Sequence, residues 1–197
     1  MGPQEKLRTF VALPLSEAGH ERLDAVQQKL IRALPDGAIR WVPPTNVHLT
    51  LFFLGDVAVG RLPVIREALA VVARNVAPFP FEVRGLGAFP HLRRPRVLWV
   101  GVAERAGRLA LLHRAVNEVL AQVGFEPETR PFHPHLTLGR VRRGNSRAVE
   151  VQLAEELSAI EVGLLIEEQA RELVLFRSVL GSAGAEYTAL HRFPLAP

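Results

Sequence analysis

The chain has 197 residues, of which 48% are hydrophobic and 22% are charged. This balance is typical of one globular domain that can bury a core of its own. The absence of cysteine excludes disulfides and thiol chemistry. The formal net charge is +4, and nearly all of the positive charge is arginine, because Lys6 and Lys29 are the only lysines. Arginine favours bidentate contacts with phosphate, so the composition indicates either an anionic ligand or an arginine-biased sequence with solvated surface charge.

The beginning of the chain, MGPQEKLRTF, contains no apolar segment of signal-peptide length. No apolar run elsewhere is long enough to cross a bilayer as a helix. We therefore expect a cytoplasmic protein with no membrane partner.

The first half of the chain is predicted to alternate short strands with amphipathic helices. An apolar run of strand-forming residues comes first, and Ser16 follows it as a candidate helix cap. Apolar residues then recur at helical spacing until Pro35, Asp36 and Gly37 form a turn. The predicted elements are a strand over 8–15, a helix over 23–34, a strand over 47–54 closed by Gly55 and Asp56, a helix over 62–76 ended by Pro78, and strands over 81–86 and 97–102.

The second half repeats this pattern. Its predicted elements are a helix over 109–123 with Gly124 at its stop, a strand over 135–141, a basic turn over 142–145, a helix over 149–157, and strands over 162–167, 173–180 and 188–193. Helices and short strands alternate irregularly, which favours an α+β fold over a parallel α/β sheet. No linker separates the halves, so we expect a single domain over residues 1–197, built as two related lobes.

Two identical segments stand at the centre of these lobes, and we call them the HLTL segments: His48-Leu49-Thr50-Leu51 and His135-Leu136-Thr137-Leu138. Side chains alternate along a strand, so in each segment the histidine and the threonine share one face. The two leucines share the other face and are expected to be buried. Each HLTL segment therefore presents a histidine and a threonine to the space between the lobes.

Two imidazoles that face one phosphate suit phosphoryl transfer by acid–base catalysis. One must be neutral to accept a proton from the nucleophile, and the other must be protonated to donate one to the leaving oxygen. Each threonine hydroxyl can donate to a non-bridging phosphate oxygen. The HLTL segments thus predict a metal-independent phosphodiesterase with His48 and His135 as its acid–base pair and Thr50 and Thr137 as phosphate ligands. Their strands should lie side by side or face to face.

Two simpler explanations compete with this one. The HLTL segments could be half-buried strands with polar residues toward solvent, but chance predicts only roughly 0.2 His-x-Thr occurrences in such a chain. A zinc site could use His48, His133 and His135, although no further ligand is evident. Metal-dependent phosphodiesterases need clustered carboxylates, whereas the three aspartates of this chain are scattered singly.

The sequence around these segments resembles the 2H phosphoesterases, and within them the bacterial and archaeal RNA 2′,3′-cyclic phosphodiesterases, also called 2′-5′ RNA ligases. The similarity covers nearly the whole chain and includes LRTFVALPL, RWVPPTNVHLTLFFLGDV, FPHLRRPRVLWVGV, RPFHPHLTLGRV and FRSVLGSAGAEYTALHRFPL. The resemblance implies a bilobal α+β fold of two pseudo-symmetric lobes, with helices outside an antiparallel sheet and an active cleft between the lobes. It implies hydrolysis of RNA 2′,3′-cyclic phosphate ends to 2′-phosphates without metal or cofactor.

The same resemblance implies a role for each site residue. His48 would protonate the departing O3′, His135 would activate water, and the two threonines would hold phosphate oxygens. Arg140 would contact the phosphate or stack on the terminal base, and Phe10 would form the other side of that base slot. The expected partner is an RNA with a 2′,3′-cyclic phosphate end, tRNA fragments among them, and the expected state is a monomer.

Sequence reasoning leaves the orientation of the arginines open. By ideal alternation Arg140 points away from Thr137, unless the strand bends at Gly139. The arginines of segments 93–96 and 142–143 either line a path for an RNA tail or are solvated loop charge.

Two other functions would use the same residues. An RNA 5′-hydroxyl in place of water would give ligation through a 2′-5′ linkage. An RNA-binding module could use the histidines only to dock phosphate, but binding does not require a matched acid and base. The intact His-x-Thr pattern in both HLTL segments therefore favours an enzyme.

Overall fold

The computed structural model describes residues 5–181 and 184–196, and its fold is α+β, as predicted. The strands are β1 (Lys6–Leu13), β2 (Ile39–Trp41), β3 (Leu49–Ala58), β4 (Phe79–Phe89), β5 (Val97–Ala103), β6 (His135–Val141), β7 (Leu164–Ala170), β8 (Glu172–Gly181) and β9 (Gly184–Pro194). The helices are α1 (Glu17–Ala33), α2 (Leu62–Arg74), α3 (Arg108–Gln122) and α4 (Arg147–Ala159), with short 3-10 turns η1 (Pro44–Asn46) and η2 (Val59–Arg61).

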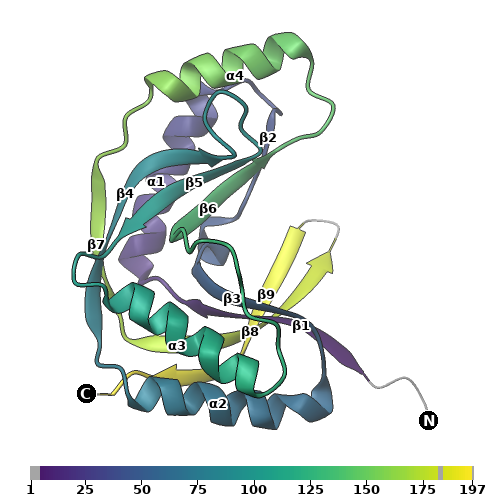
Figure 1. The fold of residues 1–197 in the computed structure, drawn as a ribbon. Coiled ribbons are helices and arrows are strands. Elements are labelled where there is room, and N and C mark those ends of the chain that lie inside the picture. The colour runs from purple at the N-terminus through teal and green to yellow at the C-terminus, as the bar shows by residue number, and fades with distance from the viewer. Residues whose placement is uncertain (1–4, 182–183, 197) are drawn as a thin grey trace.

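The strands of the described chain form one antiparallel sheet that is continuous across both lobes. Its order is β7-β4-β5-β6-β3-β1-β8-β9, and β2 pairs with the end of β6. This order is symmetric about the junction of β6 and β3, because β5 and β1 follow outward from it, and then β4 and β8. Figure 1 shows β4, β5 and β6 in the upper part of the curved sheet and β1, β3, β8 and β9 in the lower part. The two pseudo-symmetric lobes are thus the two halves of one sheet, and each combines strands from both halves of the chain, although the sequence had predicted one lobe from each half.

Two helices link the two halves of the sheet. Each of them follows a strand of one half and packs against the other half. Helix α1 follows β1 of the lower half, yet it contacts β7 and lies behind the upper strands (Figure 1). The buried Gln27 of α1 donates hydrogen bonds of 2.7 Å to the backbone oxygens of Val42 and of Leu138 in β6. Helix α3 follows β5 of the upper half and contacts β3 and α2 below. The crossed packing of α1 and α3 thus connects the halves that meet at β3 and β6.

The ends of two helices follow the sequence signals. Ser16 caps α1, since its hydroxyl accepts from the Gly19 N–H at 3.0 Å and donates to the buried Glu168 at 2.7 Å. Gly124 lies just beyond the end of α3 with φ of +86°. Its N–H bonds the Ala121 oxygen at 2.9 Å, and the next N–H bonds the Leu120 oxygen at 3.0 Å, which is the Schellman arrangement.

Strand β3 is longer than predicted, and β2 was not predicted at all. The expected stop at Gly55 and Asp56 is wrong, because both residues pair with β1, opposite Thr9 and Arg8. Gly55 has a φ of +71°, and a register shift lies beside it, so the glycine bends the strand instead of ending it. Three residues suffice for β2 because it only extends β6, and so short a segment shows no alternation to read.

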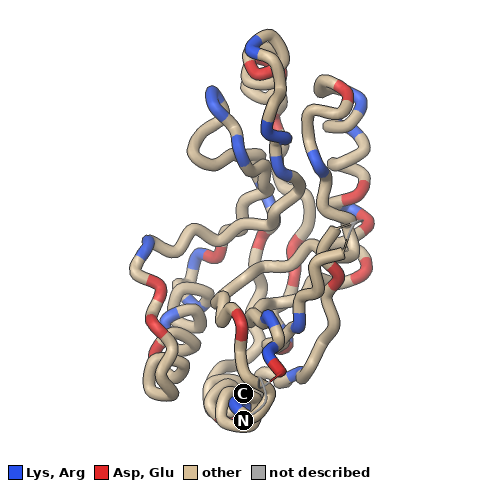
Figure 2. The backbone as a smooth tube through the Cα atoms, turned by 90° about the vertical axis from the view of Figure 1, so that its right-hand side faces the viewer, with Lys and Arg blue, Asp and Glu red and all other residues tan. Residues whose placement is uncertain are grey.

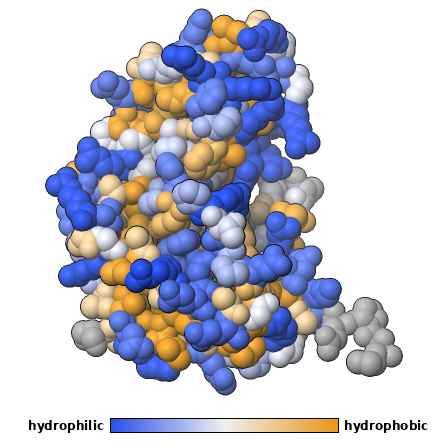
Figure 3. All heavy atoms as spheres, in the orientation of Figure 1, coloured by the Kyte–Doolittle hydropathy of each residue, from blue (hydrophilic) through white to orange (hydrophobic). Residues whose placement is uncertain are grey.

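Helices α2 and α3 form the lower outer surface. A groove of about 520 Å³ between them is lined by apolar residues such as Val71, Leu111 and Val119. Hydrophobic side chains gather over this region in the space-filling view (Figure 3). Among the helices of the described residues, none is long and apolar enough to cross a membrane.

Candidate active site

The two HLTL segments lie side by side at the centre of the sheet, as the sequence predicted. Strands β3 and β6 are antiparallel, and Leu49 lies directly opposite Leu136. Both leucines are buried, with exposed fractions of 1% and 0%. The other face carries four half-buried polar side chains, which we call the motif quartet: His48, Thr50, His135 and Thr137. Antiparallel alternation continued from this one pair sets each histidine across from the threonine of the other segment and makes the two histidines diagonal neighbours.

Both histidines are held in the same tautomer. The Nδ1 atom of His48 is 2.8 Å from the backbone oxygen of Asn46, and that of His135 is 2.7 Å from the backbone oxygen of His133. A carbonyl oxygen can only accept, so each Nδ1 donates and each Nε2 is left to exchange a proton. Asn46 is itself fixed, because its side chain donates to the Ala185 oxygen at 2.7 Å. The symmetry of the HLTL segments thus extends to the hydrogen bonds that orient their histidines.

His48 lies in an aromatic environment. Its ring stacks on Phe10 at 4.6 Å between centroids, lies 5.9 Å from Phe176, and meets Tyr187 edge-on at 5.1 Å. These rings exclude water, and burial lowers the pKa of His48 from 6.5 to about 4. The imidazole of His48 is therefore neutral at pH 7 in the protein without substrate.

His135 has a similar but more open environment. Phe89 meets its ring edge-on at 4.8 Å, and Trp99 lies 6.2 Å away. The pKa of His135 is also lowered, first by burial and then by the neighbouring charges of His133 and Arg140.

Each HLTL segment ends in a β-bulge at its second leucine. The extra residue is Leu51 in β3 and Leu138 in β6, as shown by the pairings Thr50–Ala12, Phe52–Val11, Thr137–Trp99 and Gly139–Leu98. A bulge shifts the alternation of side chains by one residue. The residue three positions after each threonine therefore returns to the face of the motif quartet. These two residues are Phe53 and Arg140.

The bulge resolves the orientation of Arg140, which the sequence left open. Arg140 pairs with Val97 of β5 and, on its other side, with Arg40 of β2, so Arg40 shares the same face. A Cβ atom on Gly139 would lie 2.7 Å from Ile39 Cγ2, so the glycine is what permits β2 to approach β6. Sequence reasoning missed Arg40, because nothing in its neighbourhood predicted the short strand that places it.

The position of Phe10 does not fit one side of a base slot. Its ring is only 2% exposed, because it packs between His48 and the aromatic residues of β8 and β9. The exposed ring on this face belongs to Phe53, which pairs with Phe10 across β1 and β3 and is 68% exposed. Strict alternation would have assigned this face to Phe52, so no sequence signal pointed to Phe53.

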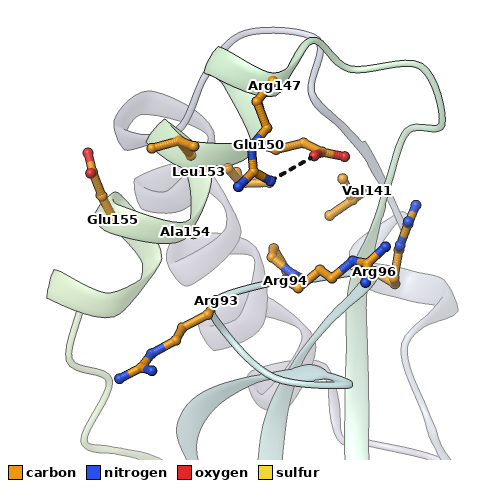
Figure 4. A pocket seen from close by; sticks show the side chains of 11 residues that line it. Arg93, Arg94, Arg96, Val141, Arg147, Glu150, Leu153, Ala154 and Glu155 are labelled. Atoms are coloured by element: carbon orange, nitrogen blue, oxygen red, sulfur yellow. Dashed lines mark ion pairs between the residues drawn. The ribbon is translucent and has the colours of Figure 1, made fainter.

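A second feature lies at the far end of β6. A cavity of about 150 Å³ is lined by Arg93, Arg94, Pro95, Arg96, Val141, Arg147, Glu150, Val151, Leu153, Ala154 and Glu155. Figure 4 shows the cavity between α4 and the loop that joins β4 to β5, with Arg93 and Glu155 pointing outward and the ion pair of Arg147 and Glu150 along one wall. We call it the arginine cavity. Basic positions also gather at this upper end of the molecule in Figure 2.

The described residues offer no evident metal site. In the ranges 5–181 and 184–196, no group of three histidine, cysteine, aspartate or glutamate side chains lies close enough to hold an ion. His48 and His135 each use Nδ1 for a backbone carbonyl.

The fold and the paired segments match one protein family. A family model described as LigT like Phosphoesterase matches the chain twice, over residues 13–99 and 100–187. The chain therefore belongs to the LigT-like phosphoesterases, a group of the 2H phosphoesterase superfamily. The two matches correspond to the two halves of the chain, each with one HLTL segment.

Individual relatives agree with this assignment. A protein of Methanothermobacter thermautotrophicus named RNA 2′,3′-cyclic phosphodiesterase is 37% identical over 190 residues, which covers 96% of this chain and 100% of that protein. A crystal structure from Thermus thermophilus superposes with a TM-score of 0.78 at 30% identity, covering 95% and 97% of the two chains. The apo structure of Escherichia coli LigT gives a TM-score of 0.77 at 27% identity, covering 98% and 99%.

Proposed function

We propose that this protein hydrolyses RNA 2′,3′-cyclic phosphate ends to 2′-phosphates, the activity named for its relatives. The observation that carries the proposal is the register of β3 and β6, which sets two tautomerically fixed imidazoles and two threonine hydroxyls on one face. We expect a single tetrahedral phosphate to contact all four groups. Both halves of the quartet lie in one chain, so we expect the monomer to be active.

The chemistry needs two proton transfers and no other catalyst. In the proposed reaction Nε2 of His135 takes a proton from a water molecule as its oxygen attacks phosphorus. The bond between phosphorus and O3′ breaks, and Nε2 of His48 gives a proton to O3′. The product is a 2′-phosphomonoester with a free 3′-hydroxyl.

The electrostatic environment supports this division of roles. Burial first, and then the nearby charges of His133 and Arg140, lower the pKa of His135, which favours the neutral state that a base requires. His48 must be protonated to act as the acid, although its pKa is about 4 in the free protein. The negative charge of the bound cyclic phosphate favours the imidazolium form, so substrate binding would raise the pKa of His48. Thr50 and Thr137 would donate to the non-bridging oxygens as charge develops on them.

The substrate contacts beside the motif quartet are part of the same proposal. We expect Arg140 to bind the phosphate, since a guanidinium makes charge-assisted hydrogen bonds with its oxygens. The buried ring of Phe10 would orient His48, and the exposed ring of Phe53 would offer a stacking surface to the terminal base.

We propose that the reaction needs no metal. The two imidazoles supply both proton transfers, and the threonine hydroxyls and Arg140 donate hydrogen bonds to the phosphate oxygens. An RNA substrate, tRNA fragments included, would also agree with the cytoplasmic location expected from the sequence. The test is incubation of an oligoribonucleotide 2′,3′-cyclic phosphate with the protein in EDTA, followed by mass spectrometry and chromatography. A product heavier by one water molecule that carries a 2′-phosphate supports the proposal, whereas activity that appears only after a divalent ion is added would refute the metal-free reaction.

Ligation and simple binding are the two alternative outcomes of that experiment. With a 5′-hydroxyl RNA also present, a longer product with a 2′-5′ linkage would show that the same site uses a different nucleophile. Tight binding with no change in mass would indicate a docking module. The matched tautomers of His48 and His135 favour chemistry over docking, since a docking site has no need of two free Nε2 atoms.

A further inference from the structure

Arg40 and Arg140 form a pair of like charges directly opposite each other. They face each other across β2 and β6, where the Cβ atoms of opposite residues are about 4.5–5.5 Å apart. Both residues are exposed, and among the ion pairs of the described residues neither takes part. Like charges in this arrangement destabilise a sheet. An anion between the two guanidinium groups would remove the repulsion and gain a charge-assisted hydrogen bond from each.

The pair lies one short step from the motif quartet. Arg140 is three residues beyond Thr137, and the bulge at Leu138 takes up one of them. The strand therefore covers about 7–10 Å between Thr137 and Arg140. Long arginine side chains can reach in either direction from there. This separation suits the phosphodiester that precedes the terminal nucleotide, when its cyclic phosphate occupies the quartet.

The surroundings of the pair favour an extended polyanion over a single small ion. The Val141 N–H, next to Arg140, donates to the Arg96 oxygen at 3.0 Å, so the arginine cavity begins at the same end of β6. Figure 4 shows Arg94 and Arg96 beside Val141 on this border. Their charges add to the positive field at this end of β6.

We infer that Arg40 and Arg140 together bind the internucleotide phosphate immediately upstream of the terminal nucleotide. The inference rests on the proposed function and deepens it, because it makes the protein selective for RNA chains over cyclic mononucleotides. Arg140 reaches both the reacting phosphate and its neighbour, whereas Arg40 reaches only the neighbour. Arg40 is thus a specificity residue, with no part in the chemical step.

Three substrates separate the contribution of the upstream charge from that of the upstream nucleoside. The first is adenosine 2′,3′-cyclic phosphate, which has no upstream phosphate. The second is the adenylyl-adenosine dinucleotide with the same cyclic end. The third is that dinucleotide with a neutral methylphosphonate linkage. For each substrate, kcat/KM is measured with the wild-type protein, Arg40→Gln, Arg40→Lys and Arg66→Gln, the last of which removes an exposed charge from the outer helix α2.

We expect Arg40→Gln to lower kcat/KM about 10-fold on the charged dinucleotide and to leave the mononucleotide and the methylphosphonate unchanged. Arg40→Lys should retain part of the preference, because it keeps the charge but loses the planar fork. Arg66→Gln should match the wild type on all three substrates. If Arg40→Gln lost activity equally on all three substrates, or lost none on the charged dinucleotide, the inference would be overturned. The proposed function would still stand in that case, provided that the wild-type protein cleaves the mononucleotide. A wild-type protein inactive on all three substrates would overturn both.

Discussion

Leu49 of β3 lies directly opposite Leu136 of β6, and this pair joins the two halves of the sheet. Because the pair is buried on one face, the histidines and threonines beside it must share the other. A shift of one residue between the strands would separate each histidine from the opposite threonine and turn one half of the quartet into the core. The position of a single leucine pair therefore determines whether an acid–base site exists.

The proposed acid and base can be told apart by a leaving group that needs no proton. A p-nitrophenyl phosphodiester of a nucleoside leaves as a stable anion, so the loss of the acid should matter little and the loss of the base should still be severe. We expect His48→Ala to recover most of its activity on this substrate relative to the cyclic phosphate, and His135→Ala to recover none. The measurement is the ratio of kcat/KM on the two substrates. Recovery by His135→Ala instead would invert the assignment.

The pH dependence of the rate should differ between free and bound protein. Burial lowers the pKa of His48 to about 4 and also lowers the pKa of His135 in the free protein. The bell-shaped curve of kcat/KM, which reports the free protein, should therefore peak below about pH 6.5. A bound phosphate favours the imidazolium, so the peak of kcat should lie at a higher pH. The two limbs belong to the pair and not to either residue alone. A kcat/KM that keeps rising well into the alkaline range would disagree with this account.

The low pKa of His48 also has a consequence for stability. The pKa is about 4 in the folded protein and about 6.5 in the unfolded chain, so the unfolded chain binds the proton more tightly. Neutral His48 makes its full contribution to the free energy of unfolding above about pH 6.5. As the pH falls toward about 4, this free energy decreases by up to about 3 kcal/mol. We expect His48→Gln to show a shallower decline in unfolding free energy over this range. Urea unfolding of both proteins at several pH values between these limits measures it, and parallel curves would contradict the prediction.

The placement of the HLTL segments was predictable because it depends on local patterns. Alternation along a short strand sets His48 and Thr50 on one face, and the repeated sequence indicates that His135 and Thr137 do the same. The helix signals at Ser16 and Gly124 are equally local, and both were confirmed. What these features share is that the deciding residues lie within a few positions of each other.

The features that sequence reasoning missed depend on pairing between distant segments. The bulges at Leu51 and Leu138 exist only relative to β1 and β5, and they decide that Phe53 and Arg140 face the quartet. Arg40 is placed by a three-residue strand that forms only because β6 is beside it. Strict alternation within one strand cannot reveal such shifts.

The threonines should contribute less than the histidines, because each supplies one hydrogen bond and no proton transfer. Thr50→Val and Thr137→Val remove the hydroxyl while keeping a β-branched side chain of similar size. We expect each to lower kcat about 10-fold, with a smaller change in KM, since the bond strengthens as charge develops. Thr188→Val, on an exposed position of β9, serves as the matched control. A change confined to KM would show that the hydroxyls only bind the substrate.

The most direct test of the acid–base pair is the kcat of His48→Ala, His135→Ala and the double variant on an oligoribonucleotide 2′,3′-cyclic phosphate. Each single change should lower kcat by about 10²–10⁴, the usual contribution of general acid–base catalysis. The double variant should be little worse than the worse single variant, because residues that act as a unit are not additive. Full activity in either single variant would contradict the account and leave phosphate docking as the role of both histidines.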